Sequence, residues 1–273
     1  VTGVQTCALP ISHHRWLRGL SKHTKHMYLR NGFNYISTMT TINIFIGYDE
    51  RESIAAEVCK FSIEKRLMFT DAHVRFLRSA DIPEFTRPRE PNQSTDFTYT
   101  RFLVPYLCGY KGLAVFCDCD FLFRTDIGHA VWGMQSQHAV KVVKHPQYVP
   151  LSQTKMDNIP QHAMKRKNWA SLIVFNNEHP ACRTLTPEYV NTVMPGRKLH
   201  TFDWLEDNQI GSLSLDWNTL DGYYELDDPR AIHYTEGGPW FDNYKHTHYS
   251  EYWWNEYDEY IAASGQQRTL TRE

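Results

Sequence analysis

The sequence lacks the features that mark membrane-spanning or secreted proteins. No apolar run approaches the roughly 18 residues that a bilayer-spanning helix needs. No convincing secretory signal or Golgi-type anchor is visible. The six cysteines show no regular disulfide framework. We therefore expect a cytoplasmic location in a reducing compartment, and peripheral contact with a membrane stays open.

A strong charge of either sign is also missing. The net charge of -2 gives no general attraction to nucleic acid, so we expect no nucleic-acid partner. Short basic clusters, such as Lys141 with Lys144 and the run 165–167, are interpreted as solvated surface. Aromatic residues are plentiful, at 14% of the chain. Flat rings with polar tips suit sugar faces as well as cores, so this abundance is only a hint.

The first 40 residues differ from the rest because they show no clear periodicity. The stretch 1–11 resembles translated sequencing-adapter sequence, so we expect the first dozen residues not to be native. We expect residues 1–40 to be poorly ordered and partly non-native. No internal repeat or linker follows, so residues 41–273 are predicted to form a single domain.

From Ile42 onwards, the hydrophobic pattern alternates between strands and helices. Short β-rich runs bounded by turn residues predict strands, and apolar residues at helical spacing predict helices. The expected strands cover 42–47, 73–77, 112–123, 138–143, 170–175 and 231–234, and the expected helices cover 54–67, 98–107, 180–193, 204–210 and 249–260. Helices that lead directly into buried strands indicate an α/β fold.

One strand carries two carboxylates, Asp118 and Asp120, in the Asp-X-Asp pattern of an otherwise apolar run. Side chains two residues apart project from the same side of an extended backbone. Hard oxygen ligands of this kind suit Mn²⁺ or Mg²⁺, whose remaining positions substrate phosphates can fill. A turn-capping role for one Asp and solvation of the other is the alternative.

Cysteines 117 and 119 alternate with these carboxylates and raise the alternative of a zinc-thiolate site. Their sulfur atoms would face away from Asp118 and Asp120, and no second cysteine pair completes a tetrahedral site. Buried packing of both thiols is the favoured interpretation.

Four segments occur in an order that resembles glycosyltransferases of the GT-A fold, with glycosyltransferase family 8 as the nearest likeness. These segments are a first strand ending at 48–50, the stretch 99–105, the Asp-X-Asp strand, and 233–240. The resemblance covers about residues 42–245. It implies a Rossmann-like mixed central sheet flanked by helices, the fold of nucleotide-diphospho-sugar transferases.

The resemblance also implies roles for individual residues. The positions after the first strand, Gly47, Tyr48 and Asp49, would hold the base and ribose of a nucleotide, and Arg101 would help to hold the nucleotide sugar. Asp118, Asp120 and His233 would coordinate the divalent metal that bridges the diphosphate. Without the resemblance, we would interpret His233 as an ordinary core histidine.

Two parts of the family pattern match less well. Asp207 and Gln209 are the candidates for contact with the acceptor or the reacting sugar, although Asn208 is inserted between them and Asp207 also suits a helix cap. Where the family has a diphosphate-binding lysine, this chain has Gly238. Backbone amides of Gly237 and Gly238 could replace that lysine. So could another cation, for which the chain offers Lys155, Lys165 and Lys245.

Together these observations predict a metal-dependent glycosyltransferase that moves a hexose from a nucleoside-diphosphate sugar, with a UDP-sugar expected, to a glycan, lipid-linked or other hydroxyl acceptor. The family implies retention of configuration. A non-catalytic nucleotide-sugar or glycan-binding protein is the alternative, because the usual lysine is absent. A sugar-phosphate nucleotidyltransferase fits less well, because residues 47–51 form no glycine-rich phosphate loop.

Overall fold

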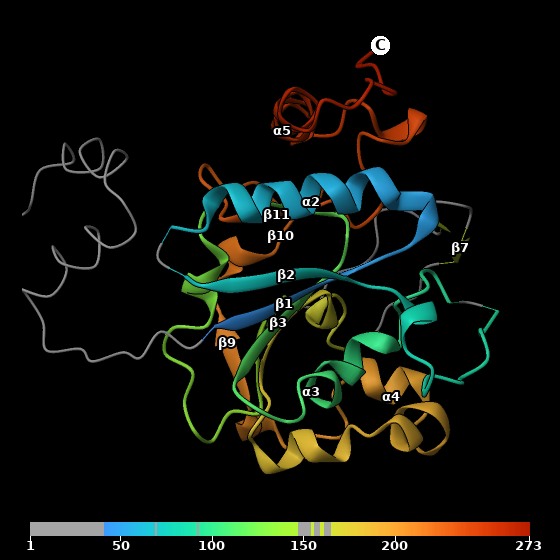
Figure 1. Cartoon of the computed structure of the whole chain (residues 1–273), viewed down its shortest axis with the longest axis vertical. Coiled ribbons are helices and arrows are strands. Elements are labelled where there is room, and N and C mark those ends of the chain that lie inside the picture. Colours follow the sequence, from blue (N-terminus) through green and yellow to red (C-terminus); the bar gives the residue numbers. More distant parts are fainter. Residues whose placement is uncertain (1–40, 69, 92, 147–153, 156–158, 161–164) are drawn as a thin grey trace, which may run out of the picture. The chain divides into compact units, whose positions relative to one another are not determined.

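The central sheet has six strands in the order β2-β1-β3-β8-β5-β9 (Figure 1). The computed structural model describes residues 41–273 apart from 69, 92, 147–153, 156–158 and 161–164, so the expectation for residues 1–40 lies outside the described residues. The strands of this sheet are β1 (Ile42–Gly47), β2 (Ala72–Leu77), β3 (Leu113–Cys117), β5 (Val140–Val143), β8 (Leu172–Asn176) and β9 (Ile210–Leu213). All run in one direction except β8, which is antiparallel to β3 and β5.

A second sheet of three strands stands beside the first and supplies part of the candidate site. It contains β4 (Phe121–Phe123), β10 (Thr219–Leu220) and β11 (Ala231–His233), in the order β10-β11-β4. β11 is parallel to β10 and antiparallel to β4. A two-stranded ladder, β6 (Thr154–Lys155) with β7 (Ile159–Pro160), completes the described strands.

Helices lie on both faces of the central sheet (Figure 1). α2 (Ser53–Arg66) packs against β1, β2 and β4, and α5 (Ser250–Ser264) packs on α2. On the other face lie α3 (Val104–Leu107) and α4 (Gly196–His200). Short 3₁₀ helices cover Glu50–Glu52, Ser79–Asp81, Thr100–Leu103, Ile127–Ala130, Trp169–Ser171, Pro180–Thr184, Asp207–Gln209, Leu215–Trp217 and Asp242–Tyr244, and a π-helix covers Tyr189–Val193. No helix in the described part of the chain combines the length and apolar character needed to cross a bilayer.

Two buried clusters hold these layers together. The larger surrounds the central sheet, where Val115, Phe116 and Val174 are fully buried. The smaller joins α2, β4, β11 and α5, and the stacked rings of Trp253 and Tyr257 lie in it. The predicted aromatic stripe of the terminal helix is therefore packing, as expected.

The α/β architecture with a mixed central sheet is confirmed, but several predicted elements differ. The expected strand 112–123 is two strands in different sheets, because the chain turns at Asp118–Asp120. The expected helix 98–107 begins as a 3₁₀ helix, and Pro105 lies in the first turn of α3. The helix expected over 180–193 is broken between Thr184 and Tyr189.

The prediction of a helix over 204–210 is wrong. A single 3₁₀ turn, Asp207–Gln209, precedes β9. The apolar residues of this range, Leu205 and Ile210, are buried separately, one in a turn and one in a strand. The prediction that the Lys141 side chain is solvated at the surface is also wrong. This residue lies within buried strand β5, and its amino group donates to the backbone carbonyls of Ala130 and Trp132.

Candidate metal and nucleotide site

The two carboxylates of the Asp-X-Asp pattern lie where the chain passes from one sheet to the other. The amide of Asp118 donates to the carbonyl of Ser171 at 2.9 Å, which continues the β3–β8 pairing. The carbonyl of Asp120 accepts from the amide of Tyr234 at 3.0 Å, which continues the pairing of β4 with β11. Both backbones are therefore fixed, and each carboxylate side chain is only 16% exposed.

His233 reaches this crossing from the end of β11. Its Cα pairs with that of Phe121, so its ring lies over the Phe121 ring, with centroids 4.4 Å apart and planes 15° apart. Its Nε2 atom is 3.3 Å from Oδ2 of Asp120. One ligand atom from each of Asp118, Asp120 and His233 lies within 4.8 Å of the other two. The structure thus brings together the three residues predicted as metal ligands.

Asn218 fixes the orientation of the His233 ring. The side-chain amide group of this fully buried residue donates to the carbonyl of Asn168 at 3.2 Å and to Oγ of Ser171 at 2.9 Å. Its Oδ1 atom can therefore only accept, and it lies 2.9 Å from Nδ1 of His233. Nδ1 consequently carries the hydrogen, and in the neutral ring Nε2 presents a lone pair toward Asp118 and Asp120.

A buried histidine supports Asn218 from the other side. The hydroxyl of Tyr224 donates to the Asn218 carbonyl at 2.9 Å and thus accepts from Nδ1 of His145 at 2.7 Å. Burial, with a smaller contribution from nearby His233, lowers the pKa of His145 to about 3. His145 is therefore neutral at physiological pH. Sequence reasoning missed Asn218, Tyr224 and His145, because no motif in a single sequence marks them.

Arg101 holds the first carboxylate. Its Nη1 atom is 2.8 Å from Oδ1 of Asp118 and also donates to the carbonyl of Ala170 at 2.7 Å, while Nε donates to the carbonyl of Thr98. The guanidinium is almost fully buried and contacts the rings of Phe97 and Phe116, which also contact each other. Arg101 thus positions Asp118, and the predicted contact with a nucleotide sugar stays a prediction.

The donor set suits a hard divalent cation. Two carboxylate oxygens and one imidazole nitrogen are ligands that Mn²⁺ and Mg²⁺ accept. Ligand atoms on opposite sides of an ion with bonds of about 2.1 Å lie about 4.2 Å apart, so the spread of 4.8 Å needs only a small closure. Asp118, Asp120 and His233 could therefore hold a divalent metal.

The segment at the end of β1 is held by contacts within the protein, and its predicted role in nucleotide binding stays a prediction. An added Cβ at Gly47 would lie 2.5 Å from the Phe97 ring, so the glycine makes room for that ring. Asp49 is buried and accepts from the side chain and amide of Arg51 and from the amide of Asp96. Burial alone would raise the pKa of Asp49, but the Arg51 hydrogen bonds outweigh it and lower that pKa. The Asp49 carboxylate is therefore already engaged as the N-cap of the 3₁₀ helix Glu50–Glu52.

Tyr48, by contrast, offers a partly exposed aromatic surface at the end of β1. The guanidinium of Arg78, from the end of β2, lies 3.5 Å from the centre of the Tyr48 ring, and Phe76 contacts the same ring. Because β1 and β3 are adjacent and parallel, Tyr48 and Asp118 follow the same edge of the sheet. This edge is where open α/β sheets bind ligands.

Asp207 and Gln209 lie apart from the metal-ligand triad. They precede the amino end of β9, whereas Asp118 follows the carboxyl end of β3, which runs in the same direction. Asp207 is 89% exposed and pairs with Arg166. Gln209 forms a capping box with Glu206, whose amide donates to Oε1 of Gln209. The catalytic role of both residues stays a prediction.

The groups that could replace the missing lysine differ in how far they are already engaged within the protein. The amide of Gly237 donates to the carbonyl of Tyr234, so it is engaged within the loop. Lys245 pairs with Asp242, and Lys165 is exposed. Lys155 has no described side chain. Added Cβ atoms at Gly237 and Gly238 would strike Tyr244 and Trp240, so both glycines serve the packing of this loop.

The two thiols beside the carboxylates are packed in the core. Cys117 and Cys119 are buried free cysteines, and burial raises the pKa of each well above its usual value. The Cys119 thiol donates to Oε2 of Glu52 at 3.7 Å, and neutral thiols are poor zinc ligands. Among the described residues, the triad of Asp118, Asp120 and His233 is the cluster with metal-ligand spacing.

The chain is similar in sequence to a known protein and similar in fold to several solved structures. No family model matches the sequence. Protein CDI of Arabidopsis thaliana is 41% identical over 236 residues, which cover 83% of this chain and 90% of that protein.

Three solved structures share the fold at low identity. The bifunctional glycosyltransferase WbbM matches 84% of this chain with a TM-score of 0.58 and 16% identity, and the match spans 51% of the WbbM chain. The galactosyltransferase LgtC, solved with donor and acceptor sugar analogues, matches 80% of this chain and 95% of its own, with a TM-score of 0.56 and 13% identity. GlyE of Streptococcus pneumoniae TIGR4 matches 85% of this chain and 66% of its own, with a TM-score of 0.52 and 15% identity. The predicted GT-A fold is thus confirmed, and the likeness to family 8 in particular stays a prediction.

Proposed function

Because the chain belongs to the family of Protein CDI and has the GT-A glycosyltransferase fold, we propose that it is a metal-dependent glycosyltransferase. It would transfer a hexose from a nucleoside-diphosphate sugar, with a UDP-sugar as the first donor to test, to a hydroxyl acceptor with retention of configuration. The carrying observation is the meeting of Asp118, Asp120 and His233 at the carboxyl end of β3.

In this proposal, Asp118, Asp120 and His233 hold the cation, with Mn²⁺ favoured over Mg²⁺ by the imidazole ligand. The bound ion would supply Lewis-acid stabilisation for the charge that develops on the leaving diphosphate. Arg101 keeps the Asp118 carboxylate in one orientation. Asn218 keeps the hydrogen of His233 on Nδ1. The protein thus supplies a preformed set of ligand atoms, which costs little reorganisation when the substrate arrives.

We further propose roles for the residues at the end of β1 and before β9. Tyr48 would contact the nucleotide base, and Gly47 and Asp49 would shape that pocket. Asp207 and Gln209 are the candidates for contact with the acceptor, which would require the loop before β9 to move toward the sugar. The acceptor would be a glycan, a lipid-linked sugar or another hydroxyl compound, and the location cytoplasmic.

The first test measures binding and turnover on one preparation. We expect UDP to raise the melting temperature only when Mn²⁺ is present, because a ligand that binds only the native state stabilises it. Nucleoside diphosphate should be released slowly from at least one nucleotide sugar. Both responses should disappear with a chelator or in Asp120→Asn.

The matched control is Asp126→Asn, which changes a buried carboxylate that accepts backbone hydrogen bonds and lies beyond the opposite end of β4 from Asp120. This variant should lose stability but keep the response to Mn²⁺ and UDP. If no nucleoside diphosphate stabilises the wild-type chain with metal, the donor site is wrongly assigned.

A non-catalytic nucleotide-sugar or glycan-binding protein is the second candidate. It is favoured by Gly238 at the usual lysine position, next to a Gly237 amide that is already engaged. Metal-dependent binding without turnover across a broad panel of donors and acceptors would select this candidate. A nucleotidyltransferase would instead form a nucleotide sugar from a sugar phosphate and a nucleoside triphosphate in the same assay.

A further inference from the structure

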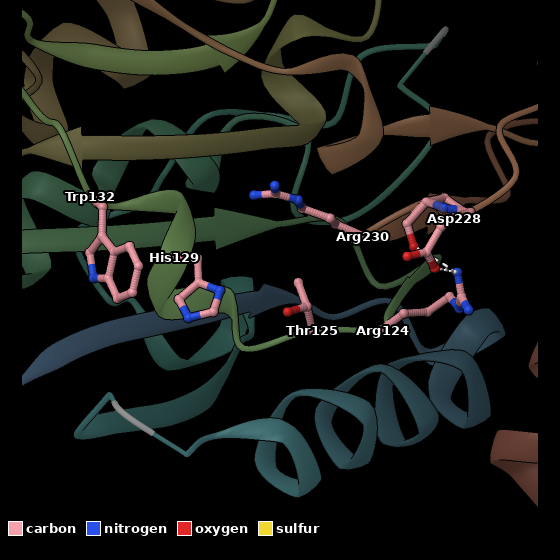
Figure 2. A pocket seen from close by; sticks show the side chains of 7 residues that line it. Arg124, Thr125, His129, Trp132, Asp228 and Arg230 are labelled. Atoms are coloured by element: carbon pink, nitrogen blue, oxygen red, sulfur yellow. Dashed lines mark hydrogen bonds and ion pairs between the residues drawn. The ribbon is translucent and has the colours of Figure 1, made fainter. Parts of the chain in front are cut away.

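A cavity lies at the far end of the β4–β11 ladder from Asp118, Asp120 and His233. Its volume is about 510 Å³, and Figure 2 shows side chains from the segment after β4 and from the segment before β11 around it. Asp120 precedes β4 and His233 ends β11, whereas Arg124 follows β4 and Arg230 precedes β11. The amide of Arg124 donates to the carbonyl of Arg230 and closes the ladder at this end. The cavity is therefore separate from the proposed donor site.

An exposed indole forms one end of this cavity. Trp132 is 62% exposed, more than any other large apolar side chain in the described part of the chain. The ring of His129 lies against it, with centroids 4.3 Å apart, and limits its rotation. A flat apolar ring beside polar groups is the kind of surface on which the face of a sugar packs.

The segment that carries Trp132 is held by buried polar contacts. The Lys141 amino group donates to the carbonyls of Ala130 and Trp132, and burial lowers the pKa of this lysine. The carboxylate of Asp126 accepts from the amides of Gly128 and Met68. Placing an ammonium group in the core is costly unless its hydrogen bonds are satisfied. Here that group fixes the backbone of an exposed tryptophan, which lowers the entropy cost of binding there.

Cationic donors lie opposite the indole. Nε of Arg230 is 2.8 Å from Oδ2 of Asp216, and Figure 2 shows the Arg230 guanidinium extending toward the Trp132 end of the cavity. The Arg230 side chain is 47% exposed. Arg124 is engaged by Asp228 and by the carbonyl of Pro229, so it shapes the wall. Thr125 adds a hydroxyl.

We propose that this cavity is a second carbohydrate-binding site, which takes a sugar unit bearing a carboxylate. The sugar face packs on Trp132, and the carboxylate pairs with the terminal amino groups of Arg230, which match its two oxygens. A volume of this size accommodates one or two sugar rings. The site does not depend on metal or on the proposed transfer reaction.

Isothermal titration of the full chain with trigalacturonic acid tests this proposal, with maltotriose as the neutral probe and inorganic phosphate as the simple anion. We expect the acidic trisaccharide to bind without added metal. Trp132→Ala and Arg230→Gln should each weaken its binding about tenfold or more, which corresponds to about 1.4 kcal/mol. Trp132→Phe should retain most of the affinity, because it keeps an aromatic face.

Two control variants separate this site from general surface effects and from the metal-ligand triad. Val193→Ala changes another exposed apolar residue and should leave the affinity unchanged. Asp120→Asn should also leave it unchanged, which keeps this test independent of the proposed donor site. Equal binding of maltotriose, complete competition by phosphate, loss of binding in Asp120→Asn, or no effect of Trp132→Ala would each overturn the proposal.

Discussion

The Nδ1 atom of His233 lies 2.9 Å from Oδ1 of Asn218, and this contact decides which ring nitrogen turns toward Asp120. The amide group of Asn218 is engaged on its other side by Asn168 and Ser171. The orientation of the His233 ring is therefore set by Asn218, which Asn168 and Ser171 in turn hold in place.

Asn218→Ala should weaken Mn²⁺ binding by about 10- to 100-fold, because partners that orient a ligating histidine typically contribute that much affinity. Titration calorimetry or the electron paramagnetic resonance of free Mn²⁺ measures the change. Asn177→Ala is the matched control, since Asn177 is an equally buried amide that donates to the Lys111 carbonyl. Both variants should lose stability, but only Asn218→Ala should lose metal affinity. An equal loss in both would remove the orienting role.

Tyr48→Ala should weaken binding of UDP in the presence of Mn²⁺ by about tenfold, since stacking of a base on an aromatic face contributes about 1–3 kcal/mol. Tyr48→Phe should bind as wild type does, because the ring that contacts Arg78 and Phe76 is retained. Equilibrium dialysis with labelled UDP measures both. Unchanged affinity in Tyr48→Ala would place the base elsewhere.

Acid should destabilise the chain through His145, whose pKa burial lowers to about 3. The unfolded chain takes up a proton at His145 below about pH 6.5. In the native state the His145 ring stays neutral down to about pH 3. Stability that is fully present above pH 6.5 is therefore lost as the pH falls from 6.5 toward 3.

At pH 5 this loss amounts to about 2 kcal/mol for His145 alone. In His145→Gln, urea unfolding should show a difference in stability between pH 7.5 and pH 5 that is smaller by about that amount. Glutamine keeps a donor for the Tyr224 hydroxyl. The same pH dependence in the variant and in the wild type would contradict the assignment of a neutral His145.

Gly47→Ala should destabilise the chain by about 1–3 kcal/mol, because the added methyl group overlaps the Phe97 ring in a packed core. Urea unfolding measures the loss. Adding Phe97→Leu should recover part of it, so that the double variant is more stable than the sum of the single effects. Strict additivity would show that the two positions do not compete for space.

The order of elements was predictable because buried strands and the terminal helix have strong patterns. β3 and β8 contain uninterrupted apolar runs, and α5 shows aromatic residues at helical spacing. The strand boundary at Asp118–Asp120 was missed because local pattern does not show that Phe121–Phe123 leaves the central sheet to pair with β11. That choice depends on contacts with residues far along the chain.

The grouping of Asp118, Asp120 and His233 could be predicted only by combining the Asp-X-Asp pattern with a family resemblance, since His233 alone looks like a core histidine. The role predicted for Asp207 stays a prediction. This residue was singled out from a loosely matching segment, and the structure gives it an exposed ion pair with Arg166. Asn218 carries no sequence signal, because the role of a buried amide depends on what surrounds it in three dimensions.

The joining of two sheets at Asp120 and His233 has a consequence for the order of folding. β3 and β4 flank the acidic turn, but β11 emerges from the ribosome only after β5, β8 and β9. A nascent chain that ends before β11 therefore carries Asp118 and Asp120 but not His233, the third proposed ligand, and it should capture Mn²⁺ weakly. Tight metal capture would then report that β11 has paired with β4 and completed the second sheet.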